Sequence, residues 1–327
     1  MIDADGTATL ELALEQHRTE LTGYCYRMLG SPFEAEDAVQ DTMVRAWRGY
    51  DKFEGRAALR SWLYRIATNV CLDMLGGKER KARPTDFTTV GSASDPSLAT
   101  HPENTWLAPT PDHKVLVGGD PADVVVARDS VRLAFVAALH HLPARQRAVL
   151  ILREVLAWPA ADVAELLDTS VASVNSALQR ARATLAAADV AATDLEEPDD
   201  EAQRVLLAKY VKAFETYDLE SLAALLHEDV TLSMPPFELW LRGADEIRTW
   251  MLGTGNGCRG SRLVPVVAAN GTPAFGQYRP AGPGRYEPWA LQVIEIADGR
   301  IVGLNSFLDT DQLFPLFGLP PHLEDED

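Results

Sequence analysis

Residues 143–185 read PARQRAVLILREVLAWPAADVAELLDTSVASVNSALQRARATL, and this stretch carries the clearest structural pattern in the chain. Its apolar residues recur at helical spacing in three runs, over 143–155, 160–167 and 171–185. A short turn, Asp168-Thr169-Ser170, separates the second run from the third, and Ser170 can cap the third helix. Two helices joined by a short turn indicate a helix-turn-helix. The alternative is three ordinary helices of a bundle.

The two faces of the third predicted helix differ in chemistry. Val171, Val174, Leu178 and Ala181 form the expected core face. The other face carries short polar groups, amides and arginines, which suit base edges and phosphates in a major groove. With the capping serine, the candidate DNA contacts are Ser170, Ser173, Asn175, Ser176, Gln179, Arg180 and Arg182.

Net charge at first counts against nucleic-acid binding. The chain has 327 residues with 30 basic and 48 acidic side chains, a balance of −18. An even spread of this charge would oppose contact with phosphates. The charge is not even, because residues 52–83 sum to +5 and residues 128–188 to +2, whereas residues 202–327 sum to −7. Two parts of the chain therefore remain suited to DNA.

Composition changes divide the chain into several parts. The length suggests two or three domains, and a hydrophobic content of 46% allows each to bury a core. Proline and glycine residues interrupt the segment 84–127, and acidic residues dominate the segment 189–201. In the last part, Asn270-Gly271 and Asp298-Gly299 separate apolar runs and predict two hairpins. The predicted parts are an all-α domain (10–83), a flexible acidic linker (84–127), a second all-α domain (128–188), an acidic linker (189–201) and an α+β domain (202–327).

The cysteines and the N-terminal residues indicate in which cellular compartment the protein works. Cys25, Cys71 and Cys258 form no C-x-x-C pair, which disfavours a disulfide framework, a zinc site or another metal site. The N-terminus lacks the pattern of a signal peptide, and no run of 18 apolar residues occurs. We expect a cytoplasmic protein that needs no cofactor and no membrane.

Two runs near the N-terminus carry a family resemblance. YCYRMLGS (24–31) with AEDAVQD (35–41), and FEGR (53–56) with LRSWLYRIATNVCLD (59–73), resemble region 2 of sigma-70-type factors. Residues 143–185 look like region 4 of the same factors. The two motifs stand in family order and most resemble the extracytoplasmic-function group, which keeps only regions 2 and 4.

The resemblance implies partners and site residues. The implied partners are core RNA polymerase, through its β′ coiled coil and β flap, and promoter DNA. The helix from Ala35 to Trp47 would dock on polymerase through Asp37, Gln40, Asp41, Val44 and Trp47. The basic part, 52–83, would open and hold the −10 element through Phe53, Arg56, Arg60, Arg65, Asn69, Asp73, Lys78, Arg80 and Lys81. The helix-turn-helix would read the −35 element. The alternative for this helix is that Val39 and Met43 are simply core and that its acidic residues form a solvated face.

The C-terminal part resembles a SnoaL-like cone, in which helices pack on a curved sheet. In sigma factors that carry such an extension, the resemblance implies regulation in cis. A small molecule could bind a cavity lined by Met234, Trp240, Tyr278, Trp289, Gln292, Asn305 and Phe307, although plain core is the alternative for its aromatic residues.

The sequence is compatible with three functions. The first is a sigma factor with a regulatory cone and no enzymatic activity. The second is a helix-turn-helix regulator that acts without polymerase, which leaves the two N-terminal motifs unexplained. The third is an enzymatic or ligand-sensing cone fused to a DNA-binding region, with His227, Asp229 and Glu238 as candidate acid–base groups. We favour the first.

Overall fold

The computed structural model describes residues 11–53, 58–77, 80–118, 121–187 and 201–324. The chain divides into two compact units, each of which draws on two separate stretches of sequence. The first unit, called here the helical unit, comprises Met1–Lys81 and Asp112–Ala191. The second, called the cone unit, comprises Ala82–Pro111 and Ala192–Asp327.

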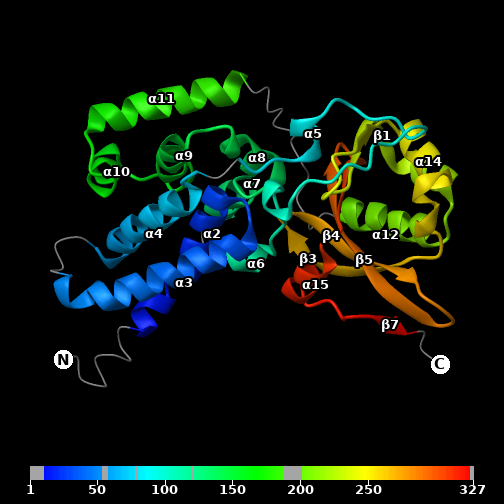
Figure 1. The fold of residues 1–327 in the computed structure, drawn as a ribbon, viewed down its shortest axis with the longest axis horizontal. Helices are drawn as coiled ribbons and strands as arrows, with labels where there is room; N and C mark the ends of the chain where they lie inside the picture. Colours follow the sequence, from blue (N-terminus) through cyan, green and yellow to red (C-terminus); the bar gives the residue numbers. More distant parts are fainter. Residues whose placement is uncertain (1–10, 54–57, 78–79, 119–120, 188–200, 325–327) are drawn as a thin grey trace. The chain divides into compact units, whose positions relative to one another are not determined.

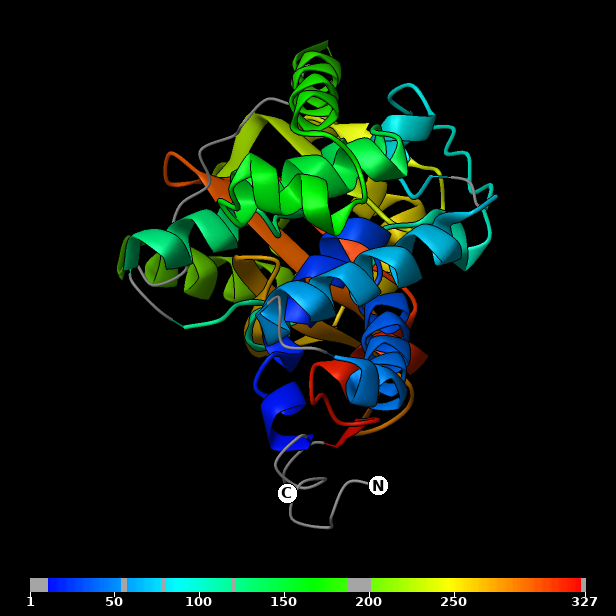
Figure 2. The same cartoon turned by 90° about the vertical axis from the view of Figure 1, so that its left-hand side faces the viewer.

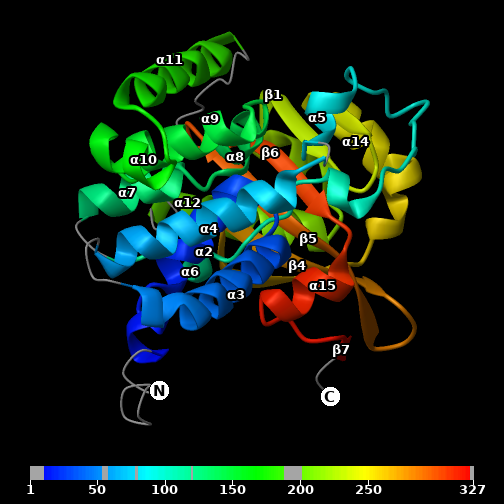
Figure 3. The same ribbon diagram turned by 60° about the vertical axis from the view of Figure 1, so that its left-hand side comes forward.

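The helical unit begins with three helices that lie side by side (Figures 1 and 3), α2 (Arg18–Leu29), α3 (Pro32–Gly49) and α4 (Leu59–Leu75). Aromatic residues dominate their shared core. The rings of Tyr24 and Tyr64 meet edge to face at 5.2 Å between centroids. The Tyr24 hydroxyl, which is fully buried, forms a 2.8 Å hydrogen bond with Thr68 Oγ1. This bond matters because a buried hydroxyl without a partner would be costly.

The remaining helices of this unit follow in sequence order (Figure 1). They are α6 (Asp112–Val115), α7 (Pro121–Asp129), α8 (Leu133–His140), α9 (Ala144–Leu150), α10 (Ala160–Leu166) and α11 (Val171–Ala187), with a π-helical turn at Ile151–Val155. The positive φ of Asp168, 51°, marks the predicted turn before α11. Ser170 Oγ accepts a 3.1 Å hydrogen bond from Ser173 N, which is the predicted N-cap. One core assignment is wrong, because Val171 begins the first turn of α11 and is 43% exposed.

The cone unit pairs a mixed sheet with helices (Figure 1). Its strands are β1 (Leu226–Ser233), β2 (Trp240–Arg242), β3 (Arg262–Ala269), β4 (Thr272–Pro280), β5 (Arg285–Ala297), β6 (Arg300–Phe307) and β7 (Leu323–Glu324), in the spatial order β2-β1-β6-β5-β4-β3 with β7 on β5. Strand β1 runs parallel to β6, and the other pairs are antiparallel. The helices are α5 (Pro84–Phe87), α12 (Glu201–Glu215), α13 (Leu219–Leu225), α14 (Ala244–Leu252) and α15 (Thr310–Leu316).

Both predicted hairpins are present. Ala269 pairs with Thr272 across Asn270-Gly271, and Ala297 pairs with Arg300 across Asp298-Gly299. All four turn residues have positive φ, between 50° and 73°. Two consecutive positive φ values make a type I′ turn, whose twist matches that of the flanking strands. Local sequence therefore fixes the register of β3 with β4 and of β5 with β6.

Helices α12 and α14 lie against the sheet (Figures 1 and 2), and their apolar side chains join those of the sheet in one core. Tyr210 of α12 and Trp250 of α14 are almost fully buried there together with Ile294 and Ile296 of β5. The Tyr210 hydroxyl donates a 2.7 Å hydrogen bond to Gln292 Oε1. The fold class predicted from the sequence, two all-α domains followed by an α+β cone, is confirmed.

The segment 84–127 differs from the predicted flexible linker. Residues 82–111 pack on the cone and belong to its unit. Gly91 N donates to Trp240 O at 2.9 Å, and Glu238 N donates to Ala99 O at 3.0 Å. Ala93 joins the cone's apolar core. The prolines of this segment correctly indicate a lack of long helices and strands. They do not reveal that the segment packs on residues about 140 positions further along the chain.

The rest of the predicted linker belongs to the helical unit. Helix α6 packs on α2, where a Cβ added at Gly23 would lie 2.5 Å from Val115 O. The predicted linker is therefore divided between the two units. The second predicted linker, 189–201, lies outside the described residues except for Glu201, which begins α12.

Candidate polymerase and DNA interfaces

Helix α3 has one buried face and one exposed face. Ser31 Oγ accepts from Glu34 N and Pro32 occupies the first turn, so the sequence starts this helix as predicted. Ala35, Ala38 and Val39 are fully buried against the neighbouring helices. Val39 is therefore core, as the alternative interpretation held.

The opposite face of α3 carries the predicted polymerase contacts. Val44 is 45% exposed and Trp47 is 53% exposed, which is unusual for large apolar side chains. Asp37 and Gln40 are exposed beside them, and Asp41 is half-buried in a 2.8 Å ion pair with Arg45. Exposed aromatic and apolar residues with a polar rim are typical of a protein interface.

Helix α11 exposes every predicted −35 residue. Val174, Leu178 and Ala181 are buried on one face. The opposite face exposes Ser173, Asn175, Ser176, Gln179, Arg180 and Arg182, with Ser170 at the cap. Arg182 Nε also contacts Glu154 Oε1 at 3.0 Å, an exposed pair that contributes little stability and can open.

Helix α4 carries most of the described residues predicted for the −10 element. Asn69 and Asp73 are exposed on it, and Arg45 lies 3.4 Å from the Asp73 carboxylate. Phe53, which precedes α4, is half-buried and packs against Trp62 at 4.9 Å between ring centroids. Arg56 and Lys78 lie outside the described residues.

Several basic side chains of this surface contact other residues of the helical unit. Arg65 Nη2 donates to Glu165 O of α10 at 2.6 Å. Arg60 forms a 2.7 Å ion pair with Glu20 of α2 and lies over the rings of Tyr64 and Trp158, at 5.3 Å and 5.4 Å. Arg80 Nη1 lies 2.7 Å from His141 Nδ1. The predicted −10 surface is therefore partly covered within the helical unit.

Lys81 does not fit its predicted role as a contact to the −10 element. Its side chain is buried, with 8% of the residue exposed, and Nζ lies 3.6 Å from Glu34 Oε2. A phosphate cannot reach an ammonium group that is buried beside a carboxylate. In this arrangement Lys81 therefore supports the fold, because its charge is satisfied inside the protein.

Two buried arginines, which sequence analysis did not single out, join the two halves of the helical unit. Arg147 of α9 donates to Met28 O of α2 and, at 3.0 Å, to Leu139 O. Arg27 of α2 donates to Ser130 Oγ at 2.7 Å and 3.0 Å. Burial lowers the pKa of both guanidinium groups to about 10. The sequence signals Arg27, an arginine among apolar and aromatic residues, but it does not distinguish Arg147 from the neighbouring Arg145.

The cone interior leaves little room for a ligand. The cavity between α12, α14 and the sheet has a volume of about 30 Å³, which holds roughly one water molecule. Of the predicted lining residues, Met234, Trp289, Gln292 and Asn305 border it, whereas Trp240, Tyr278 and Phe307 do not. Buried side chains such as Tyr210 and Trp250 fill the space, so the predicted ligand cavity is not formed at that place.

The candidate acid–base residues of the cone do not gather around that cavity. His227 Nδ1 accepts from the backbone of Asp229 at 3.1 Å. Glu238 instead binds the segment 82–111, through Ser97 Oγ at 3.0 Å and His101 Nε2 at 3.2 Å. None of the three candidates lines the cavity.

Comparison with known proteins agrees with this architecture. Family models match residues 13–81 (Sigma-70 region 2), 132–185 (Sigma-70, region 4) and 207–304 (SnoaL-like domain). The ECF RNA polymerase sigma factor SigG of Mycobacterium tuberculosis is 44% identical over 319 residues, which cover 94% of this chain and 83% of that protein. The chain belongs to the extracytoplasmic-function sigma factor family. The resemblance read from its motifs is confirmed.

A second relative extends this comparison. The sigma factor SigJ of Mycobacterium tuberculosis is 29% identical to this sigma factor over 316 residues, 92% of this chain and 91% of SigJ. The crystal structure of SigJ has a TM-score of 0.59 at 24% identity and covers 96% of this chain and 100% of the SigJ chain. The overall fold of this sigma factor is thus found in a solved structure. None of the helices in the part of the chain described here has both the length and the apolar character needed to cross a membrane.

Proposed function

We propose that this sigma factor binds core RNA polymerase in the cytoplasm and directs it to specific promoters through the residues assigned above. The exposed Val44 and Trp47 on α3, beside Asp37 and Gln40, carry the proposal. A DNA-binding regulator that acts alone has no use for an apolar and acidic docking face. The β′ coiled coil and the β flap of polymerase are the proposed docking partners.

The docking face is tested by Trp47→Ala in run-off transcription with core polymerase. Truncating an exposed anchor of an interface typically costs at least 2 kcal/mol, so polymerase affinity should fall about thirtyfold. Val205→Ala is the matched control, because Val205 is 46% exposed on α12 of the cone unit. Equal transcription from the two variants would contradict the proposed docking face.

The two DNA-reading surfaces must separate for promoter binding. The −10 and −35 elements lie about 25 base pairs apart, roughly 85 Å along B-DNA. In the helical unit, by contrast, Arg65 of the −10 surface directly contacts Glu165 of α10. We infer that this arrangement is a closed state. Polymerase binding would release Arg65 and Arg80 from their partners in the helix-turn-helix half and would remove Trp158 from Arg60, which would free these side chains for DNA.

The cone is proposed to regulate this opening in cis, without catalysis. Residues 82–111, which connect the region 2 helices to the region 4 helices, pack on the cone. Glu238 binds two points of this segment, Ser97 and His101, and Trp240 Nε1 donates to Thr88 O at 2.9 Å. By holding the connection between regions 2 and 4, the cone would limit how far they can part.

Glu238→Ala tests this regulatory role. It removes both side-chain contacts to the connecting segment, and run-off transcription should therefore change. Glu220→Ala is the control, because Glu220 is an exposed carboxylate of the same unit whose contact is a 3.6 Å ion pair with Arg248. Identical transcript yields from Glu238→Ala, Glu220→Ala and the unchanged protein would refute regulation through this contact.

A further inference from the structure

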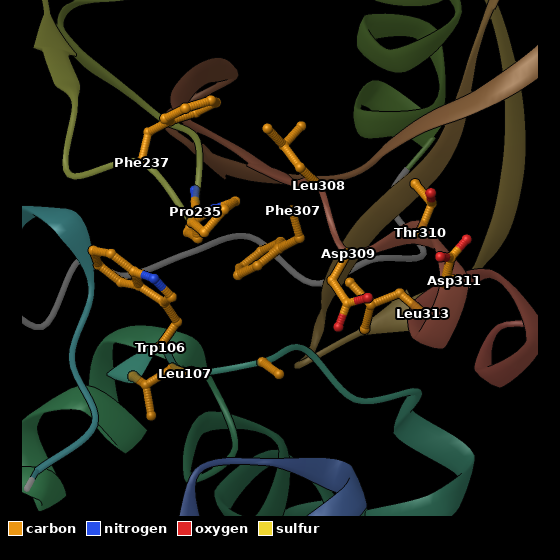
Figure 4. A pocket seen from close by; sticks show the side chains of 12 residues that line it. Trp106, Leu107, Pro235, Phe237, Phe307, Leu308, Asp309, Thr310, Asp311 and Leu313 are labelled. Carbon is orange, nitrogen blue, oxygen red and sulfur yellow. The ribbon is translucent and has the colours of Figure 1, made fainter. Parts of the chain in front are cut away.

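A second cavity lies within the cone unit, away from the filled interior. Its volume is about 350 Å³, within the range of small-molecule sites. Trp106 and Leu107 form one side, and Pro235, Phe307 and Asp309 are among the residues on the other (Figure 4). Phe307 is the one residue that this pocket shares with the cavity predicted from the sequence.

Backbone contacts and edge-to-face ring contacts fix Trp106 at the edge of the pocket. Its ring packs against Phe87 and His101 at 5.4 Å and 5.6 Å between centroids. Backbone bonds on both sides hold it, because Ala82 N donates to Thr105 O at 2.9 Å and Leu107 N donates to Ala82 O at 3.2 Å. The aromatic wall is therefore pre-formed.

The indole nitrogen of Trp106 is an unused donor. Trp106 is only 4% exposed, and its Nε1 has no hydrogen-bond partner among the described residues. Figure 4 shows this nitrogen on the edge of the ring that faces Phe307. A buried donor normally has a partner, so a ligand in the pocket would need an acceptor atom for it.

The charged groups of the pocket are acidic. Asp309 and Asp311 line it, and none of the described lining residues is basic. In Figure 4 the Asp309 carboxylate lies beside Leu313 and Phe307, whereas the Asp311 side chain points away from Phe307. Gln312 Nε2 donates to Asp309 Oδ2 at 2.8 Å, which fixes the carboxylate. The cone unit as a whole has 11 basic and 26 acidic side chains, a net charge of −15.

We propose that this pocket binds a small organic cation with an aromatic or apolar body and an oxygen acceptor. The ammonium group would pair with Asp309, since opposite charges attract strongly in a partly dry site. Phe307 and Trp106 would contact the apolar body and favour a cation through their ring faces. The oxygen would accept from Trp106 Nε1.

Tyramine combines these three features and serves as the probe. Titration calorimetry with the full-length protein should show one saturable site. p-Cresol lacks the ammonium group, and 3-(4-hydroxyphenyl)propionate reverses its charge, so neither should bind measurably. Phenethylamine lacks only the phenol oxygen, and we expect it to bind several-fold more weakly than tyramine.

Two substitutions place the probe in this pocket. Asp309→Asn keeps the shape of the side chain and should weaken tyramine about tenfold or more, because a charged hydrogen bond is lost. Trp106→Phe keeps the ring and removes the donor. It should abolish the difference between tyramine and phenethylamine. Asp245→Asn is the control, because Asp245 is an exposed carboxylate at the start of α14 in the same unit.

Several results would overturn the assignment. These are an absence of tyramine binding, equal binding of tyramine and p-cresol, or an affinity that Asp309→Asn and Trp106→Phe leave unchanged. Thermal unfolding of each variant shows whether its fold is intact. Should Asp309→Asn fail to fold, Trp106→Phe with the tyramine and phenethylamine pair still decides the question.

A consequence for transcription rests on the proposed regulatory function. The pocket takes Trp106–Ala108 from the connecting segment and the remaining residues from the cone. A ligand would therefore bridge the two and change run-off transcription. Calorimetry tests the site and transcription tests its role, so the failure of one can be distinguished from the failure of the other.

Discussion

At the scale of single residues, buried charge distinguishes this protein. Arg147 is 4% exposed and places its guanidinium between backbone carbonyls of α2, α8 and the following turn. The carbonyl oxygens accept hydrogen bonds from the guanidinium but carry no full negative charge. The folded protein therefore contains a desolvated cation. Such a group stabilises the native state only while all of its hydrogen bonds are made.

Arg147→Met should destabilise the helical unit by about 3 kcal/mol, because the carbonyls of Met28, Leu139 and Leu142 lose a shared donor. Urea unfolding followed by circular dichroism measures this change. Arg180→Met, at an exposed arginine of α11, should alter stability by less than about 0.5 kcal/mol. Similar losses in both variants would show that Arg147 does not have this role.

His140 gives the helical unit a pH dependence. Burial lowers the pKa of His140 well below 6.5, and the positive charges of Arg147, Lys81 and Arg80 lower it further. In the unfolded chain, therefore, the imidazole of His140 binds a proton as the pH falls through 6.5, whereas in the folded chain it stays neutral at that pH. Stability is full above that pH and falls as the pH drops below it. Between pH 7.5 and 5.5 the expected loss is about 1.3 kcal/mol.

His140→Gln isolates this effect, because glutamine cannot gain the proton. The difference in unfolding free energy between pH 7.5 and pH 5.5 should shrink by about 1.3 kcal/mol in the variant. His322→Gln is the control, at a half-exposed histidine near the C-terminal end of the described chain. An unchanged pH profile in His140→Gln would mean that other groups cause the acid sensitivity.

At the scale of elements, tight turns fix the strand pairing of the cone. Gly299 has a φ of 68°, and a Cβ there would meet no atom within 4 Å. Gly299→Ala should therefore cost about 1–2 kcal/mol from backbone strain alone. Gly118→Ala provides the comparison, because that Cβ also enters open space and Gly118 lacks a positive φ. Thermal unfolding that is equally sensitive to both changes would contradict this reasoning.

At the scale of the whole molecule, the central expectation is the opening of the helical unit. Trp158 joins its two halves, because its ring packs against that of Tyr64 at 5.0 Å between centroids and lies beneath Arg60. Trp158→Ala should shift the population toward an open state, since a buried aromatic contact of this kind contributes several kcal/mol. Free DNA binding should then become stronger and more sensitive to salt.

Fluorescence energy transfer between dyes at Asn69→Cys and Ser176→Cys measures that opening. The three native cysteines are buried and unpaired, so they should label slowly. Transfer efficiency should fall when Trp158→Ala is added, and it should fall in the unchanged protein when core polymerase binds. A constant efficiency under both conditions would rule out the proposed opening.

Much of this architecture was predictable because it is local. Helix starts at Ser31 and Ser170 follow from capping chemistry, and the two hairpins follow from Asn-Gly and Asp-Gly turns. The exposed faces of α3 and α11 follow from helical periodicity. The same rules misplaced Val171 and Lys81, because the depth of burial depends on which neighbours cover a residue.

Local sequence patterns were enough to predict the family, the order of the modules and the side chains proposed to contact polymerase and DNA, since these depend on spacings of a few residues. Three further features follow only from the three-dimensional packing of the chain. It placed residues 82–111 on the cone, it covered Arg60 and Arg65 with the helix-turn-helix half, and it moved the open pocket from the cone interior to Trp106 and Asp309. Each depends on contacts between residues roughly 100 or more positions apart, and no local pattern encodes which distant surface a segment will meet.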